Sequence, residues 1–366
     1  MRCHLVRSCL PPRTSTSTDI NDSHTGQFLR VLSIDSFTAM ASFIVAIERL
    51  RRTSGEPCFP GVYELVLGGF SREDEAVIMD GVCLPWGGTS TLESTMSCLP
   101  NLERISFVNS SEGKTSSLMS PMSECPAFPN VKTYVWRYKL GNLSMRLFRR
   151  SLPTLKSVEI HKTFGAALID ALDAMTVAVE AIDNTLESMR IVINEDASRS
   201  KGMWLWVAED PRFAEALAVR CRRLFAALPH LRAFSFECPS WCLPEHAITP
   251  IISAVMVSLP PSVRHVAIEW SLDYCMGRNF PVQQRARFIP GGVQRTQDRF
   301  DRQALGVLEP IQAWAVLRRA EEASKLRQLR LTTSAKSWGP LCKPPTADLI
   351  VAQLCKMHGL DFAWMF

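Results

Sequence analysis

The chain has 366 residues and a formal net charge of +5, with 46% hydrophobic and 21% charged residues, a balance that excludes wholesale disorder. Its length fits two or three ordinary domains or one long repeat array, which is not limited by a single closed core. No apolar run reaches the roughly 18 residues that a membrane-spanning helix needs, so no membrane association is expected.

The N-terminal segment, residues 1–27, is rich in serine and threonine, and Arg2 and Arg7 interrupt any apolar run. We expect a flexible terminus here rather than a secretion signal. The chain has 12 cysteines, a modest density, and several of them occupy positions typical of core residues, such as Cys58 and Cys98. Reduced, buried thiols favour an intracellular protein, so we expect a cytoplasmic or nuclear location.

A short phrase recurs along the chain. It reads Cys58-Phe-Pro-Gly-Val in one copy and Cys98-Leu-Pro-Asn-Leu in the next, and it returns from Ala127, Ser151 and Ala227. Recurrence of this kind indicates stacked units of one supersecondary type. The proline cannot continue a helix, so it favours a stop between an expected helix and the next strand.

After each proline the sequence follows the spacing L-x-x-L-x-L, typical of a short half-buried strand. The pattern starts at Leu29, Val62, Leu102, Val131, Leu155, Leu186, Leu231, Val263 and Leu326. Between these strands, apolar residues recur with a helical period, as they do after residues 29–34 and 155–160. We therefore predict an α/β solenoid of about eight or nine irregular βα units over residues 28–335, with a parallel sheet on its concave face.

The spacing resembles that of irregular leucine-rich repeats, similar to those of fungal F-box-like proteins. The copies that carry the resemblance are Leu102-x-x-Ile105-x-Phe107, Leu155-x-x-Val158-x-Ile160, Leu231-x-x-Phe234-x-Phe236 and Leu326-x-x-Leu329-x-Leu331. No F-box pattern is evident in residues 1–27. The resemblance implies a non-catalytic protein–protein interaction module, such as a scaffold or substrate-recognition subunit, with a ubiquitin-ligase adaptor or its substrate as a partner.

Residues 271–302 break the repeat and are predicted to form a basic loop insertion. Between residues 276 and 302, six arginines stand against two aspartates, and Pro281 and Pro290 favour an irregular backbone. Because this one segment holds most of the positive charge, an extended basic face for nucleic acid is not expected. Residues 336–366 are expected to form a C-terminal cap.

One face of the predicted sheet carries charged side chains. If the fourth and sixth positions of each strand face the core, the third, fifth and seventh line the opposite face, with neighbouring strands about 4.8 Å apart. The charged residues of this face, called here the charged strip, are Arg104, Arg137, Glu159, His161, Arg190, Glu237, His265, Glu269 and Arg330. Ser106 and Val135 are expected beside them. Mixed charges in one strip favour a protein partner held by charge complementarity.

A second constellation, Cys238-x-x-x-Cys242-x-x-x-His246, offers three ligands of the kind that zinc uses. Cys221 or Cys275 would have to supply the fourth. The alternative function is therefore a metal-binding protein or metalloenzyme. The chain holds no G-x-S-x-G, H-E-x-x-H, G-x-G-x-x-G or C-x-x-C motif, so our first expectation is a non-catalytic protein without a cofactor.

Overall fold

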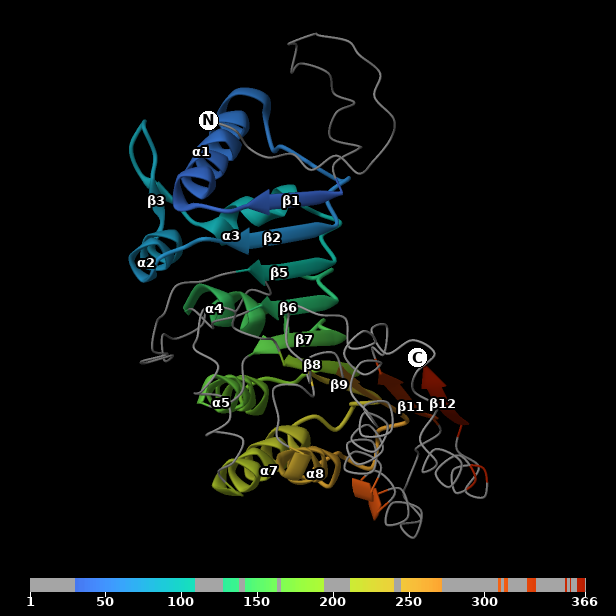
Figure 1. The fold of residues 1–366 in the computed structure, drawn as a ribbon. Helices are drawn as coiled ribbons and strands as arrows, with labels where there is room; N and C mark the ends of the chain where they lie inside the picture. The colour runs from blue at the N-terminus through green and yellow to red at the C-terminus, as the bar shows by residue number, and fades with distance from the viewer. Residues whose placement is uncertain are drawn as a thin grey trace, which may run out of the picture. The chain divides into compact units, whose positions relative to one another are not determined.

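The computed structural model describes residues 30–108, 128–137, 142–162, 166–193, 211–239, 245–271, 309–310, 313–314, 328–333, 353, 356 and 361–365. The chain divides into two compact units. The first comprises residues 1–160 and 182–185, and the second comprises residues 161–181 and 186–366. Each unit alternates strands and helices, and Figure 1 shows the strands as successive arrows with the helices beside them.

The first unit contains five neighbouring strands in the order β1-β2-β5-β6-β7. They are β1 (Val31–Ile34), β2 (Glu64–Gly68), β5 (Arg104–Val108), β6 (Thr133–Arg137) and β7 (Ser157–Lys162), the last two residues of β7 being assigned to the second unit. The pairs β1–β2, β2–β5 and β5–β6 are parallel. The helices of the unit are α1 (Phe37–Ser54), α2 (Arg72–Asp80), α3 (Leu92–Thr95), the 3-10 turn η2 (Met96–Cys98) and α4 (Asn142–Ser151). A small antiparallel hairpin, β3 (Val82–Cys83) with β4 (Thr89–Ser90), follows α2.

The second unit continues the alternation with its own strands, in the order β8-β9-β10-β11-β12. The strands are β8 (Ser188–Ile193), β9 (Ala233–Pro239), β10 (His265–Ser271), β11 (Gln328–Thr333) and β12 (Asp361–Met365), and every neighbouring pair is parallel. The helices α5 (Ala166–Glu180), α7 (Pro211–Ala226) and α8 (Glu245–Met256) pack in succession. The strand β12 lies within the predicted C-terminal cap, whereas the predicted N-terminal tail and nearly all of the 271–302 insertion fall outside the described residues.

The recurring phrase sets the strand register. Each strand that follows a copy begins six residues after the start of the phrase, so that Cys58 leads to Glu64, Cys98 to Arg104 and Ala227 to Ala233. In the sheet, Glu64 pairs with Arg104 and Arg104 with Thr133, so equivalent positions lie side by side. The prediction of an α/β fold built on parallel strands is confirmed.

The turns between helix and strand bind one another in the first unit. The side chain of Asn101 donates to the carbonyl of Pro60 at 2.8 Å, and that of Asn130 donates to the carbonyl of Pro100 at 2.6 Å. Thr185 repeats the contact with the carbonyl of Pro153 at 3.3 Å. In the two Pro-Asn copies, the asparagine thus satisfies a backbone acceptor of the preceding turn, which gives the recurring asparagine a structural role.

The helix ends follow from local sequence. Ser36 caps α1 by accepting from the backbone N–H of Ala39 at 3.3 Å, and the helix ends at Gly55, whose φ of 88° suits glycine. Ser71 and Asp74 form a reciprocal capping box at the start of α2. The N-caps fix where α1 and α2 begin, and therefore how short the connections from β1 and β2 are.

An aromatic cluster forms the core of the first unit. Phe107, Tyr134, Trp136 and Phe148 are all buried, with ring centroids between 4.4 and 5.9 Å apart. Burying side chains of this size contributes roughly 1.5–3 kcal/mol each, and aromatic pairs add about 0.5–1.5 kcal/mol. The Tyr134 hydroxyl donates to the carbonyl of Ser144 in α4 at 2.5 Å, so it stays satisfied inside the core.

Apolar helix stripes form the core of the second unit, as the helical periodicity predicted. The buried residues of α5 and α7 include Leu168, Leu172, Met175, Val179, Leu217, Cys221 and Leu224. On the outside, Arg223 of α7 pairs with Glu180 of α5 through two contacts of 2.8 and 2.6 Å. The two helices are therefore joined both by their apolar faces and by an exposed ion pair.

The exposure expected for part of this face is wrong, although Ser106 does lie on the predicted face, where its hydroxyl contacts Glu64. Ser106 and Val135, predicted to line the charged strip, are 3% and 0% exposed. Alternation tells which residues share a face of a strand, but parallel sheets are commonly covered on both faces, so an alternate position need not meet solvent. None of the helices that the structure describes combines the length and hydrophobicity that a membrane crossing requires.

Candidate interaction surface

In the first unit the charged strip is built around Arg104. This residue opens β5, in register with Glu64 of β2, while the alternate residue Ile105 is fully buried on the other face. The Arg104 Nε donates to Glu64 Oε1 at 3.1 Å, and its Nη2 lies 3.9 Å from Glu159 Oε2 of β7. The Ser106 hydroxyl donates to the same Glu64 oxygen at 2.8 Å. One arginine therefore bridges carboxylates from two other strands.

These contacts hold the charges in place without burying them. The side chains of Arg104 and Glu64 are 35% and 30% exposed, and that of Glu159 is 17% exposed. Ion pairs with this much solvent contact contribute on the order of 0–1 kcal/mol, so they order the side chains more than they stabilise the fold. A partner that offers its own charges loses little by displacing them.

Arg137 ends β6 on the same face and is exposed. It lies in register with Val108 of β5, and no hydrogen bond or ion pair joins its side chain to the residues that the structure describes. A guanidinium in this position presents five donors in a planar fork that matches a carboxylate. Arg137 can therefore meet an acidic group from outside the chain.

The second unit carries its own members of the charged strip. Arg190 of β8 pairs with Glu237 of β9 at 2.6 Å, both partly exposed, and His265 is exposed at the start of β10. Glu269 lies in register with Glu237, and Arg330 with Ala267, but their side chains are outside the described part of the structure. His161 is half-buried in β7.

Glu64 was missed by the sequence prediction, which did not extend the strip to the strand of Val62. The sequence did contain the signal, because Glu64 occupies the third position of that strand, one of the positions expected to line the charged strip.

The predicted metal constellation lies largely outside the described residues. Cys242 is not described, nor are the side chains of Cys238, at the end of β9, and His246, in α8. Among the residues that are described, no group of three potential ligands gathers. Cys221, one candidate for the fourth ligand, is a fully buried thiol of α7 whose pKa is raised to about 12 by desolvation, an environment that opposes the thiolate a metal needs.

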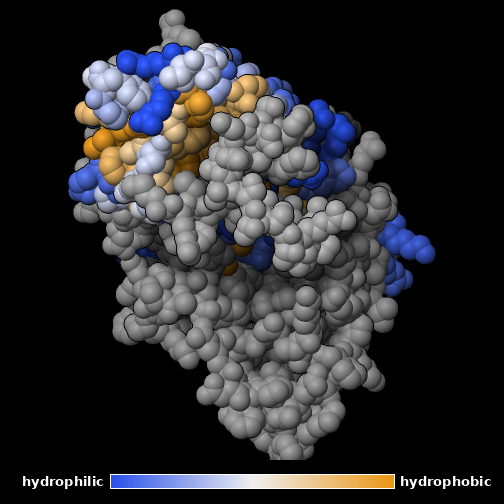
Figure 2. All heavy atoms as spheres, turned by 90° about the horizontal axis from the view of Figure 1, so that it is seen from above, coloured by the Kyte–Doolittle hydropathy of each residue, from blue (hydrophilic) through white to orange (hydrophobic). Residues whose placement is uncertain are grey.

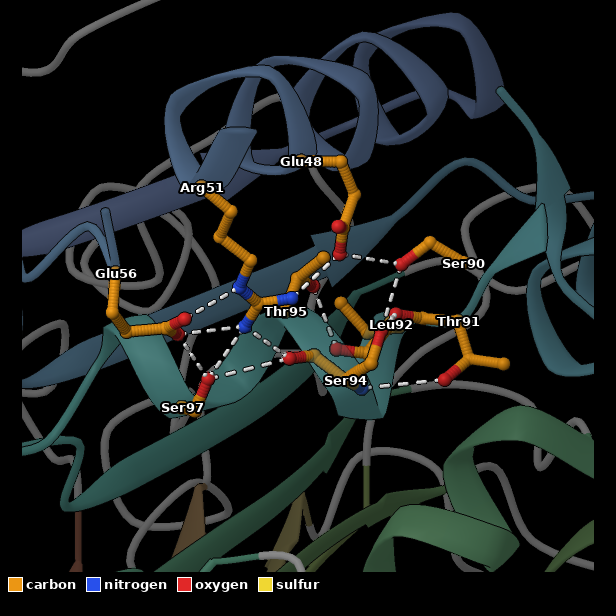
Figure 3. Close-up of polar contacts among 9 residues, drawn as sticks. All are labelled: Glu48, Arg51, Glu56, Ser90, Thr91, Leu92, Ser94, Thr95 and Ser97. Carbon is orange, nitrogen blue, oxygen red and sulfur yellow. Dashed lines mark hydrogen bonds and ion pairs between the residues drawn. The ribbon is translucent and has the colours of Figure 1, made fainter. Parts of the chain in front are cut away.

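A polar network that the sequence did not predict joins α1 to the α3–η2 segment (Figure 3). Arg51 donates to both carboxylate oxygens of Glu56 at 2.8 Å, to the Ser97 hydroxyl at 2.6 Å and to the carbonyl of Ser94 at 2.6 Å. The hydrogen bonds to Glu56 raise the pKa of Arg51 and lower that of Glu56. Because Arg51 and Ser97 are 46 residues apart, no local sequence signal points to the contact.

Hydrophobic side chains also reach the surface at the end of the first unit. Figure 2 looks down on the end that carries α1 and β1 and shows hydrophobic atoms there among hydrophilic ones. Leu50 of α1 is 39% exposed, and Phe37 and Phe43 are half-buried. This is the outer side of the first βα unit, where no preceding strand is described.

No protein-family model matches this sequence, and no curated protein is significantly similar to it.

Proposed function

We propose that this chain is a leucine-rich-repeat-like solenoid that acts as a non-catalytic protein-binding module through its charged strip. The observation that carries the proposal is the register of the phrase, which puts Glu64, Arg104 and the start of β6 side by side on one face. A row assembled from equivalent positions of several units is the type of surface that repeat proteins use for extended partners.

The chemistry of the strip favours a protein partner with mixed charges. Arg104 lies between two carboxylates, and Arg137 offers an exposed cation a short way along the sheet. Alternating signs suit a polypeptide with both acidic and basic side chains, and they disfavour a uniformly charged ligand such as nucleic acid.

A substrate-recognition subunit of a ubiquitin ligase is one form of this function. It rests on the resemblance of the repeats alone and predicts that a ligase adaptor accompanies the purified chain. Recovery of a partner without any ligase adaptor would exclude the ligase role and leave a scaffold protein as the proposed function.

The test is affinity purification of the intact chain from its native cells, with mass spectrometry and elemental analysis of the same sample. The informative variant is Arg137→Glu, because the side chain is exposed and forms no ion pair with described residues. Arg49→Glu on α1 is the matched control, an arginine that is also exposed but lies off the sheet. We expect Arg137→Glu to lower partner recovery at least tenfold and Arg49→Glu to leave it unchanged.

Equal recovery with both variants would refute the strip as the binding site. A chain that carries stoichiometric zinc and no partner would instead favour the metal-binding alternative built on Cys238, Cys242 and His246.

A further inference from the structure

The residue at the first position of the recurring phrase is always small, a feature that the proposed binding function does not explain. The residues there are Cys58, Cys98, Ala127, Ser151 and Ala227. Two consecutive copies carry cysteine. Their strands, β2 and β5, are neighbours, and Glu64 and Arg104, each six residues after its cysteine, are paired. Cys58 and Cys98 therefore occupy equivalent places in adjacent units.

Three hydrogen bonds hold the two cysteine segments together. On one side, the Ser97 hydroxyl donates to Glu56 Oε1 at 2.8 Å. Between the two cysteines, the backbone N–H of Phe59 donates to the carbonyl of Cys98 itself at 2.7 Å. On the other side, Asn101 donates to the carbonyl of Pro60 at 2.8 Å. Segments hydrogen-bonded in this way are expected at about the 4.8 Å spacing of neighbouring strands, which lies within the Cα separations of roughly 4.4–6.8 Å that a disulfide spans.

The two thiols differ in exposure. Cys58 is exposed, whereas Cys98 is fully buried, and its burial raises its pKa to about 12 even though Arg51 nearby acts in the opposite direction. Cys58 is therefore the thiol that meets a reagent in solution. Cys98 needs no access of its own, because the sulfur that it would attack lies in the adjacent turn of the same chain.

We propose that Cys58 and Cys98 are a redox pair, which a low-molecular-weight disulfide converts to an intramolecular disulfide between the turns before β2 and β5. In the first step the Cys58 thiolate attacks one sulfur of the reagent, forms a mixed disulfide and releases one reagent thiolate. In the second step, which is the slower one because burial disfavours the Cys98 thiolate, Cys98 loses its proton to water and attacks the Cys58 sulfur, which expels the second reagent thiolate. The two cysteines lose two electrons and two protons, and the reagent disulfide is reduced to two thiols.

The disulfide would act on the end of the first unit. It would join the α1–β2 connection to η2, which the Arg51 network already brings together (Figure 3). Closing this loop of the chain restricts the unfolded state, so oxidation is expected to raise the melting temperature.

The experiment treats the reduced full-length chain with oxidised glutathione, blocks the remaining thiols and maps disulfides by mass spectrometry of a non-reducing digest. Trypsin places Cys58 in the peptide 53–72 but leaves Cys83 and Cys98 together in the peptide 73–104, because no lysine or arginine lies between. The assay is therefore run on wild type and on Cys83→Ser. A second digest that cleaves after Glu93 places Cys83 and Cys98 in different peptides.

We expect the link between the peptides 53–72 and 73–104 in both proteins, its loss in Cys58→Ser and Cys98→Ser, and a higher melting temperature for the oxidised wild type. Cys58→Ser keeps the test independent of folding, because it changes an exposed side chain. A stable glutathione adduct on Cys58, a link from Cys58 to Cys83, or no link in Cys83→Ser would overturn the proposal.

Discussion

At the scale of single residues, Tyr134 links sheet and helix in the first unit. Its buried hydroxyl donates to the carbonyl of Ser144, and desolvation raises its pKa well above the usual value, so the phenol stays neutral. We predict that Tyr134→Phe lowers the free energy of unfolding by about 1 kcal/mol, the typical net value of one hydrogen bond. Tyr63→Phe is the matched control, since Tyr63 is 45% exposed. Chemical denaturation measures both, and equal stabilities would contradict the role of the bond.

The buried thiol of Cys221 predicts a dependence of stability on pH. Its pKa is raised from 9.0 to about 12 in the folded chain by desolvation. A raised folded pKa means that stability is complete below the unfolded pKa and is lost as pH rises towards the folded one. We predict that this thiol lowers the free energy of unfolding by about 1.4 kcal/mol per pH unit above pH 9.

The measurement is denaturant unfolding from pH 8 to pH 10.5 for wild type, Cys221→Ala and, as a control for the loss of one thiol, Cys83→Ala. Cys221→Ala should be less stable at pH 8, because it leaves a cavity, but should lose stability less steeply with pH. Parallel curves for wild type and Cys221→Ala would show that the thiol does not titrate as its burial implies.

At the scale of elements, the turns are expected to stabilise one another through their asparagines. Asn101→Ala and Asn130→Ala remove side-chain bonds of 2.8 and 2.6 Å to the preceding turn. Each should lower the free energy of unfolding by about 0.5–1.5 kcal/mol. His230→Ala is the control, because His230 follows the proline of its own copy, is exposed and donates no such bond to described residues. If all three variants are equally stable, the turn-to-turn bonds contribute nothing.

Most of the strands were predictable because the recurring phrase places the same kinds of residue before the strand in each copy. In each copy of the phrase a proline precedes the strand, and an apolar residue two positions before the strand anchors the turn, as Leu102 does for β5 and Leu231 for β9. The hairpin β3–β4 was not predicted, because two-residue strands carry too few positions for a period to show.

The candidate site was only partly predictable, because a sequence period gives the face on which a side chain lies but not what packs over that face. Period-two alternation put Arg104 and Glu159 on one face, and their 3.9 Å contact agrees with that assignment. It could not tell that Val135 would be covered, since covering depends on what packs over the sheet. Nor could it find the contacts of Arg51 with Ser97, which depend on the folded path of the chain between them.

At the scale of the whole molecule, we propose that the βα units present a partner-binding surface on their sheets. In each unit, ion pairs hold charged side chains of the strip in place: those of Arg104 in the first unit and the pair Arg190–Glu237 in the second. We predict that single neutralisations such as Glu64→Gln change stability by less than about 1 kcal/mol, because these pairs are partly exposed. Thermal unfolding of Glu64→Gln checks this, and a larger loss would make the strip a structural feature rather than a binding one.

The most direct test of the binding surface is chemical protection of Arg137 in the complex. A dicarbonyl reagent modifies exposed guanidinium groups, and mass spectrometry follows the rate at each arginine with and without the recovered partner. We predict that the partner slows modification of Arg137 at least tenfold while Arg49, exposed on α1, reacts at an unchanged rate. Unchanged reactivity at Arg137, with protection elsewhere, would contradict the proposal that the charged strip binds the partner.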